Sequence, residues 1–180
     1  MVKNGQPGQE FCTPQEAATA LRSDRDRNHQ GGLVLSGEVM MGKYGTGSGT
    51  DRLWTSGLAT CVRIAVTGDY SVQGSNNNNK DRFLAHVDEE GRDEALQGLI
   101  NSVMAAKARG LVNLKATVFA LDPQKDGGTG DSLQDEFNEK VTDSIEALIG
   151  RKPKMEWHSQ HVDGKLSIES NKQIVPGADV

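Results

Sequence analysis

Cysteine is the residue of this chain with the clearest potential for covalent chemistry. Of the two cysteines, Cys12 lies in a polar lead-in and is expected to be a bystander. Cys61 follows a turn of small residues, Thr55 to Thr60, and opens an apolar stretch. Small residues let backbone N–H groups converge near the sulfur, where they would stabilise a thiolate or a tetrahedral oxyanion. Taken alone, this local pattern still favours a buried, inert cysteine.

A nucleophilic thiol needs a base, and His86 is the candidate among four histidines. It lies in a second apolar stretch, Phe83 to Val87, and a loop rich in asparagine separates this stretch from the one that Cys61 opens. Two strands joined by one hairpin would bring the thiol and the imidazole close together. A Cys–His dyad is a standard means of activating a thiol for acyl transfer. His29 lies in a charged stretch and is expected at the surface.

Two other motifs are weaker candidates for a site. His158 and His161 form a His-x-x-His pair close to Asp163. The pair would suit a metal only if both rings shared a face, and residues three apart in a strand point to opposite faces. The glycine-rich segment 45–50 is not followed by Gly-Lys-Ser/Thr, so we predict a mobile loop and not a phosphate cradle. We therefore expect neither a metal nor an organic cofactor.

Helices are predicted around these motifs at residues 13–22, 93–108 and 132–149. The first begins with a capping box, and the other two carry apolar residues at helical spacing. The predicted apolar face of the second contains Leu96, Leu99, Ile100, Val103 and Met104; that of the third contains Leu133, Phe137, Val141, Ile145 and Leu148. Gly110 and Gly150 stand where the C-terminal caps should lie.

Strands are predicted between the helices and after them. Their approximate ranges are 33–35, 39–41, 53–55, 61–66, 83–87, 112–121, 155–157 and 165–174, and Asp163-Gly164 is a turn signal that joins the last two as a hairpin. The order of elements predicts a mixed α/β or α+β fold with both long helices packed on a sheet. We expect a single domain over 1–180, with a flexible lead-in at 1–12 and a loose tail at 176–180.

Composition excludes several function classes. The chain has 25 acidic and 20 basic residues and a formal net charge of −5, which argues against a protein that coats nucleic acid. No apolar run approaches the roughly 20 residues of a membrane helix, so no membrane partner is expected. Residues 1–9 are polar and do not resemble a secretory signal. The expected setting is the cytoplasm, or that of an effector translocated without a signal peptide.

The motifs around Cys61 and His86 resemble those of a known family. Thr55-Ser-Gly-Leu-Ala-Thr-Cys61 is similar to the Thr-Leu-Gly-x-Gly-Ser-Cys signature of CheD-like chemoreceptor glutamine deamidases. Met41-Gly-Lys-Tyr44 looks like their Met-Gly-Glu-Tyr, and Ala85-His86 looks like the Ala-His that supplies their catalytic histidine. Glutamine-deamidating toxins of the cytotoxic-necrotizing-factor type share the Cys–His arrangement. The resemblance spans residues 37–120, with Ala59 and Thr60 where the family has glycine and serine.

This resemblance implies a three-layer sandwich and a protein glutamine deamidase, that is, a protein-glutamine glutaminase. By matched position, Cys61 would be the nucleophile, His86 the general base and acid, and Thr55 the residue that orients the imidazole. The backbone N–H groups of Ala59, Thr60 and Cys61 would stabilise the oxyanion. The partner would be a protein bearing a target glutamine. The alternatives are a non-catalytic protein-binding or degenerate member of the fold, and a cysteine protease or transglutaminase-like acyl transferase. An active dyad would give Cys61 a low pKa.

Overall fold

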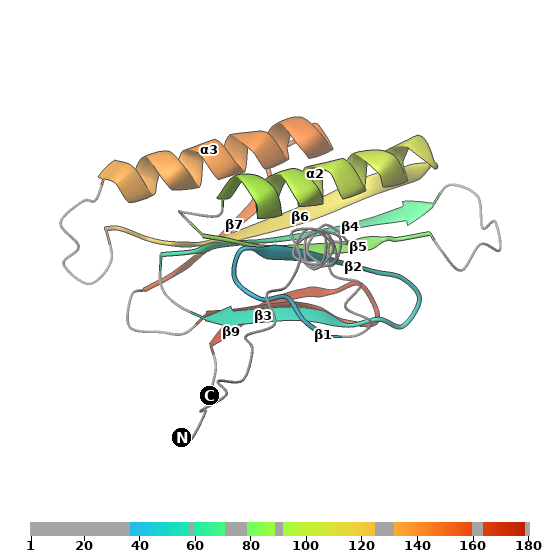
Figure 1. Ribbon diagram of the computed structural model, residues 1–180, viewed down its shortest axis with the longest axis horizontal. Helices are drawn as coiled ribbons and strands as arrows, with labels where there is room; N and C mark the ends of the chain where they lie inside the picture. The colour runs from blue at the N-terminus through green and yellow to red at the C-terminus, as the bar shows by residue number, and fades with distance from the viewer. Residues whose placement is uncertain are drawn as a thin grey trace, which may run out of the picture. The chain divides into compact units, whose positions relative to one another are not determined.

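Two helices and two β-sheets are stacked as three layers in the computed structural model (Figure 1). The structure describes residues 37–57, 60–70, 79–88, 92–124, 132–159 and 164–178, which all belong to one unit, Gly31–Val180. The elements follow in the order β1 (Gly37–Glu38), β2 (Lys43–Gly47), β3 (Leu53–Gly57), β4 (Val62–Tyr70), β5 (Arg82–Val87), α2 (Arg92–Ala108), β6 (Leu111–Leu121), α3 (Ser132–Ile149), β7 (Lys154–His158), β8 (Gly164–Ile168) and β9 (Ile174–Ala178). The predicted α+β sandwich is confirmed.

The larger sheet is the middle layer, and both of its faces are buried. Its strand order is β2-β5-β4-β6-β7, antiparallel except for the parallel pair β6 and β7. Along β4, Val62 and Ile64 point into the core under the helices, whereas Ala65 points into a second core against the other sheet. The second sheet has the order β1-β3-β8-β9. Because β4 is covered on both sides, it carries a nearly continuous buried run.

The hairpin of β4 and β5 confirms the central prediction about the two candidate strands. Their antiparallel register pairs Val62 with Val87 and Arg63 with His86. Residues 71–78, which contain most of the asparagine run, lie outside the described residues, as do the predicted helix at 13–22 and the predicted strand at 33–35.

Two predictions near the start of the described chain are wrong. The strand expected at 39–41 is displaced to Gly37–Glu38, and Met40 and Met41 are exposed. The loop expected at 45–50 is partly a strand, because β2 extends to Gly47. A Cβ at Gly45 would lie 2.8 Å from a methyl group of Val39. Glycine therefore marks a close approach within a strand here and not a mobile segment.

The prediction of a hairpin around Asp163-Gly164 is also wrong. β7 pairs with β6 in the larger sheet, whereas β8 pairs with β3 in the smaller one. The two strands serve different cores, since Met155 packs under the helices and Leu166 packs between the sheets. Alternation along each strand is the same in both arrangements, so the pattern does not reveal which sheet a strand joins.

The last predicted strand is two strands, and the second of them includes part of the predicted tail. β8 ends at Ile168 and β9 begins at Ile174, with Lys172 at a φ of +67° in the intervening turn. Residues 176–178, expected to be loose, pair with β8. Pro176 is accommodated because β9 is an edge strand, where a missing N–H leaves no neighbour unpaired.

Both long helices form where the apolar spacing predicts them. Of the residues on the predicted faces, Met104 and Leu133 are instead exposed, at 51% and 64%, and Ile100 is only partly buried. In α2 the small residues Ala95 and Ala106 complete the buried face instead. Gly110 and Gly150 follow the helices with φ values of +96° and +74°, as expected of C-terminal caps. None of the helices described is long and apolar enough to cross a membrane.

Candidate functional site

A threonine–histidine hydrogen bond joins the two sheets at the centre of the candidate site. Thr55, on β3 of the smaller sheet, places its Oγ1 2.7 Å from Nδ1 of His86, on β5 of the larger sheet. The same hydroxyl donates to the carbonyl of Val39 at 2.6 Å. Thr55 and His86 are both buried. The structure therefore brings Thr55 and His86 into direct contact, two of the three residues that the sequence predicts for the site.

This geometry fixes the protonation of the imidazole. A threonine hydroxyl has one hydrogen, and Thr55 uses it on the carbonyl of Val39. The oxygen of Thr55 must then accept the hydrogen bond from His86, so Nδ1 of His86 carries the proton. In a neutral ring, Nε2 is left as a lone-pair acceptor. That nitrogen is buried and has no hydrogen-bond partner within the described residues.

Cys61 immediately precedes β4 on the side of the sheet that His86 occupies. Arg63 lies directly opposite His86, and strand alternation places Cys61 on the same face as Arg63. The side chain of Cys61 is buried and its thiol is free. Because Nε2 of His86 has no partner in the described region, the thiol and the imidazole are not hydrogen-bonded to each other. The strand register places them on the same face of the sheet, on adjacent strands.

Burial keeps both members of the pair uncharged. Desolvation raises the pKa of the Cys61 thiol, against the lowering effect of Arg63 and with a further raising effect of Asp88. Desolvation and the positive charge of Arg63 lower the pKa of His86 to about 4, against the raising effect of Asp88. The low thiol pKa expected of an active dyad is therefore not found. At neutral pH the site holds a thiol and a neutral base.

Arg63 is a site residue that the sequence interpretation missed. Its guanidinium is fully buried, donates to the carbonyl of Gly57 and lies 3.3 Å from Nε2 of His158. Its Cζ lies 5.6 Å from the centre of the Phe119 ring, a distance at which a cation is attracted to the ring face. Its position in the sequence, as the one charged residue of the apolar stretch 61–66, could have indicated a buried cation that needs a specific partner.

His158 supports Arg63 and is not arranged as a metal ligand. Its Nδ1 is 3.1 Å from the carbonyl of Ser159, to which it donates, so Nε2 accepts from Arg63. The acceptor nitrogen that a metal would need is thus already used. His161 and Asp163 lie outside the described residues, and within those described no three His, Cys, Asp or Glu side chains converge.

Two buried amides hold the backbone just before Cys61. Gln134 donates to the carbonyl of Thr60 at 3.2 Å and to Oδ1 of Asn138 at 2.9 Å. Asn138 donates in turn to the carbonyl of Leu121 at 2.9 Å. Gln134 and Asn138 are four residues apart on α3, so they share a helix face, and both are buried. The sequence analysis did not predict either residue as part of the site. The side chain of Thr60 itself is exposed, and Ala59 lies outside the described residues.

Gly57 shapes the wall beside the imidazole. Its φ is +128°, a conformation open essentially to glycine alone. A Cβ placed there would lie 3.4 Å from Cε1 of His86. The carbonyl of Gly57 also accepts from Arg63, so one residue contacts the base and the buried cation.

The depressed pKa of His86 predicts a loss of stability in mild acid. The unfolded chain protonates this histidine below 6.5, but the folded chain does so only below about 4. The contribution of neutral His86 to the free energy of unfolding is complete above pH 6.5. It is lost as the pH falls toward 4, and the loss amounts to about 3 kcal/mol at most. Urea unfolding at a series of pH values measures this slope. His86→Asn should flatten it, and an unchanged slope in that variant would assign the acid sensitivity to other groups.

No family model matches the sequence, and no curated protein shows significant similarity to it.

Proposed function

We propose that the chain is a cysteine-dependent amidohydrolase, in particular a protein glutamine deamidase. The observation that carries the proposal is the hydrogen bond from Nδ1 of His86 to Thr55, which leaves Nε2 as an unprotonated acceptor with no partner among the described residues, on the sheet face that Cys61 shares. A base in this tautomer is what a thiol needs to become a nucleophile. The choice of a glutamine side chain rests on the resemblance of the Thr55–Cys61 segment and Ala85-His86 to the deamidase motifs.

The reaction proceeds through a thioester at Cys61. Nε2 of His86 takes the thiol proton as the sulfur attacks the carboxamide carbon of glutamine, and the oxyanion is stabilised by backbone N–H groups of Thr60 and Cys61. Protonated His86 then gives its proton to the leaving ammonia. Water, deprotonated by His86, cleaves the thioester to give glutamate and the free thiol. Proton removal accompanies attack, because both groups start uncharged.

The positive charge of Arg63 favours this sequence of events. It offsets part of the rise that burial causes in the pKa of the Cys61 thiol, and so stabilises the sulfur as negative charge develops. It also disfavours a resting imidazolium by lowering the pKa of His86. The partner is a protein that presents a flexible glutamine. The enzyme would meet it in the cytoplasm or, as a translocated effector, in another cell.

The expected product is glutamate at specific glutamines of a substrate protein. Incubation with a panel of native proteins should release ammonia and raise the mass of a target peptide by about one dalton, which peptide mass spectrometry localises. Cys61→Ala should abolish both signals, because no sulfur remains to form the thioester. Cys12→Ala is the matched control and should retain them. Equal activity in Cys61→Ala would refute the proposal.

A non-catalytic protein-binding domain is the second candidate. The raised pKa of the Cys61 thiol favours it, because a buried cysteine that stays a neutral thiol is typical of a packing residue. Under this alternative the whole panel stays unmodified. Adding a primary amine and examining peptide termini in the same assay detects a transglutaminase-like or protease activity of the same pair.

A further inference from the structure

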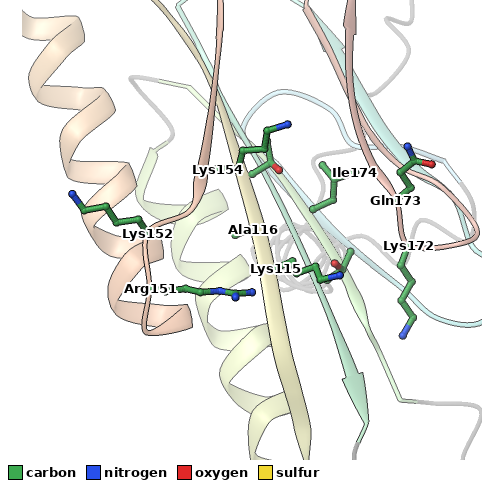
Figure 2. A pocket seen from close by; sticks show the side chains of 10 residues that line it. Lys115, Ala116, Arg151, Lys152, Lys154, Lys172, Gln173 and Ile174 are labelled. Atoms are coloured by element: carbon green, nitrogen blue, oxygen red, sulfur yellow. The ribbon is translucent and has the colours of Figure 1, made fainter.

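A basic pocket lies between the larger sheet and the turn that joins β8 to β9 (Figure 2). Its volume is about 470 Å³. Among the described residues that line it none is acidic, and five are cationic: Lys115, Arg151, Lys152, Lys154 and Lys172. The chain as a whole has 25 acidic residues against 20 basic ones. The pocket therefore has a charge opposite to that of the protein.

Strand register gathers these residues at a distance from the cysteine. Thr67 of β4 pairs with Lys115 of β6, and Thr117 of β6 pairs with Lys154 of β7. Thr67 lies six positions after Cys61 along an extended chain, a separation of about 20 Å. The pocket is thus a site distinct from the candidate active site, and its function does not depend on the proposed reaction.

The cations of the pocket differ in whether they already form ion pairs within the protein. Lys172 donates to the carbonyl of Gly68 at 2.9 Å and pairs with Asp69 and Asp81 at 3.0 Å, so it is a fixed part of the wall. Lys154 pairs with Glu156. Within the described chain, Lys115 forms no ion pair and is exposed.

Arg151 is the second cation available to a ligand. It donates one N–H to the carbonyl of Leu114, and its other guanidinium donors bond to none of the described residues. Figure 2 shows the side chain of Arg151 extending toward Lys115, whereas Lys152 points the other way. Arg151 and Lys115 therefore form the positive centre of the pocket, and Lys152 contributes to its outer field.

We propose that the pocket binds a group carrying several phosphates. An arginine fork with a nearby lysine matches the geometry of phosphate oxygens, and the hydroxyls of Thr67 and Thr117 supply neutral donors. Exposed cations each contribute little in water, so a ligand needs several charges close together. Among the described lining residues the charged and hydroxyl groups are the ones that can recognise a ligand, and they suit phosphates. A soluble polyphosphorylated molecule and a phosphoinositide headgroup share this chemistry.

Calorimetric titration with inorganic tripolyphosphate at low salt tests the proposal on the full chain. Saturable binding is expected, and Lys115→Glu should weaken it at least about tenfold, equivalent to 1.4 kcal/mol. Lys140→Glu, an exposed position on α3, makes the same change of net charge and should leave the affinity unchanged. Amide resonances of Thr67 and Lys115 should shift on titration. Co-sedimentation with phosphatidylcholine vesicles containing a phosphoinositide bisphosphate distinguishes a lipid source from a soluble one.

Three results would overturn the proposal. The first is no saturable binding of tripolyphosphate by the unmodified chain. The second is equal weakening by Lys140→Glu, which would mean a diffuse charge effect. The third is tight binding of a polyglutamate peptide with none of tripolyphosphate, which would make the pocket a docking surface for acidic protein segments.

Discussion

Replacing His86 with asparagine is expected to slow ammonia release by about 10²–10⁴-fold, the usual contribution of a general base. The asparagine amide can occupy the place of Nδ1 and still donate to Oγ1 of Thr55, which lies 2.7 Å from that nitrogen. It has no atom in place of Nε2, so the base is removed while the link between the sheets is kept. Single-turnover assays with a peptide substrate identified by the mass-spectrometric screen measure the effect.

Thr55 provides the control that separates positioning from catalysis. Thr55→Val removes the acceptor for Nδ1 of His86 and the donor to Val39, so the ring loses its fixed tautomer. Thr55→Ser keeps the hydroxyl and should restore most of the rate. Far-ultraviolet circular dichroism reports whether each variant folds. If folded His86→Asn retained the rate of the unmodified chain, His86 would be a structural residue and another base would be required.

The sequence predicted the cysteine–histidine part of the site because that part depends on local patterns. A strand, a polar loop and a second strand specify a hairpin, and the hairpin alone sets Cys61 near His86. Thr55 was assigned only by resemblance. Its role depends on a contact between sheets, and alternation on β3 gives the buried face but not the partner across it.

The unpredicted parts arise from long-range packing. Whether β7 joins the larger sheet is decided by pairing with β6 across the whole of α3, and its sequence pattern carries no such information. The environment of Arg63 follows from that choice, because β7 brings His158 to it and β6 brings Phe119. The raised thiol pKa is equally non-local, since burial from several elements is its main cause.

Replacing Arg63 with methionine is expected to lower the free energy of unfolding by about 3 kcal/mol, because one buried and one half-buried acceptor lose a charged donor. Those acceptors are the carbonyl of Gly57 and Nε2 of His158. Arg52→Met is the matched control. Arg52 is 49% exposed and pairs with Glu169 at 2.9 Å, so its loss should cost less than about 1 kcal/mol. Urea unfolding at pH 7 compares the two variants.

The pKa values of His86 and Cys61 give a second measurement of the role of Arg63. They would not change on replacement of Arg63 if its role were only structural. The charge of Arg63 lowers the pKa of both His86 and Cys61. Arg63→Met should therefore raise both, so that His86 titrates above about 4 and the thiol is alkylated only at still higher pH. Arg63→Lys keeps the charge and should preserve the histidine pKa, although one ammonium cannot reproduce the guanidinium fork. An unchanged pKa of His86 in folded Arg63→Met would leave Arg63 as a packing residue, and the thiolate of the reaction would have to be stabilised by the backbone alone.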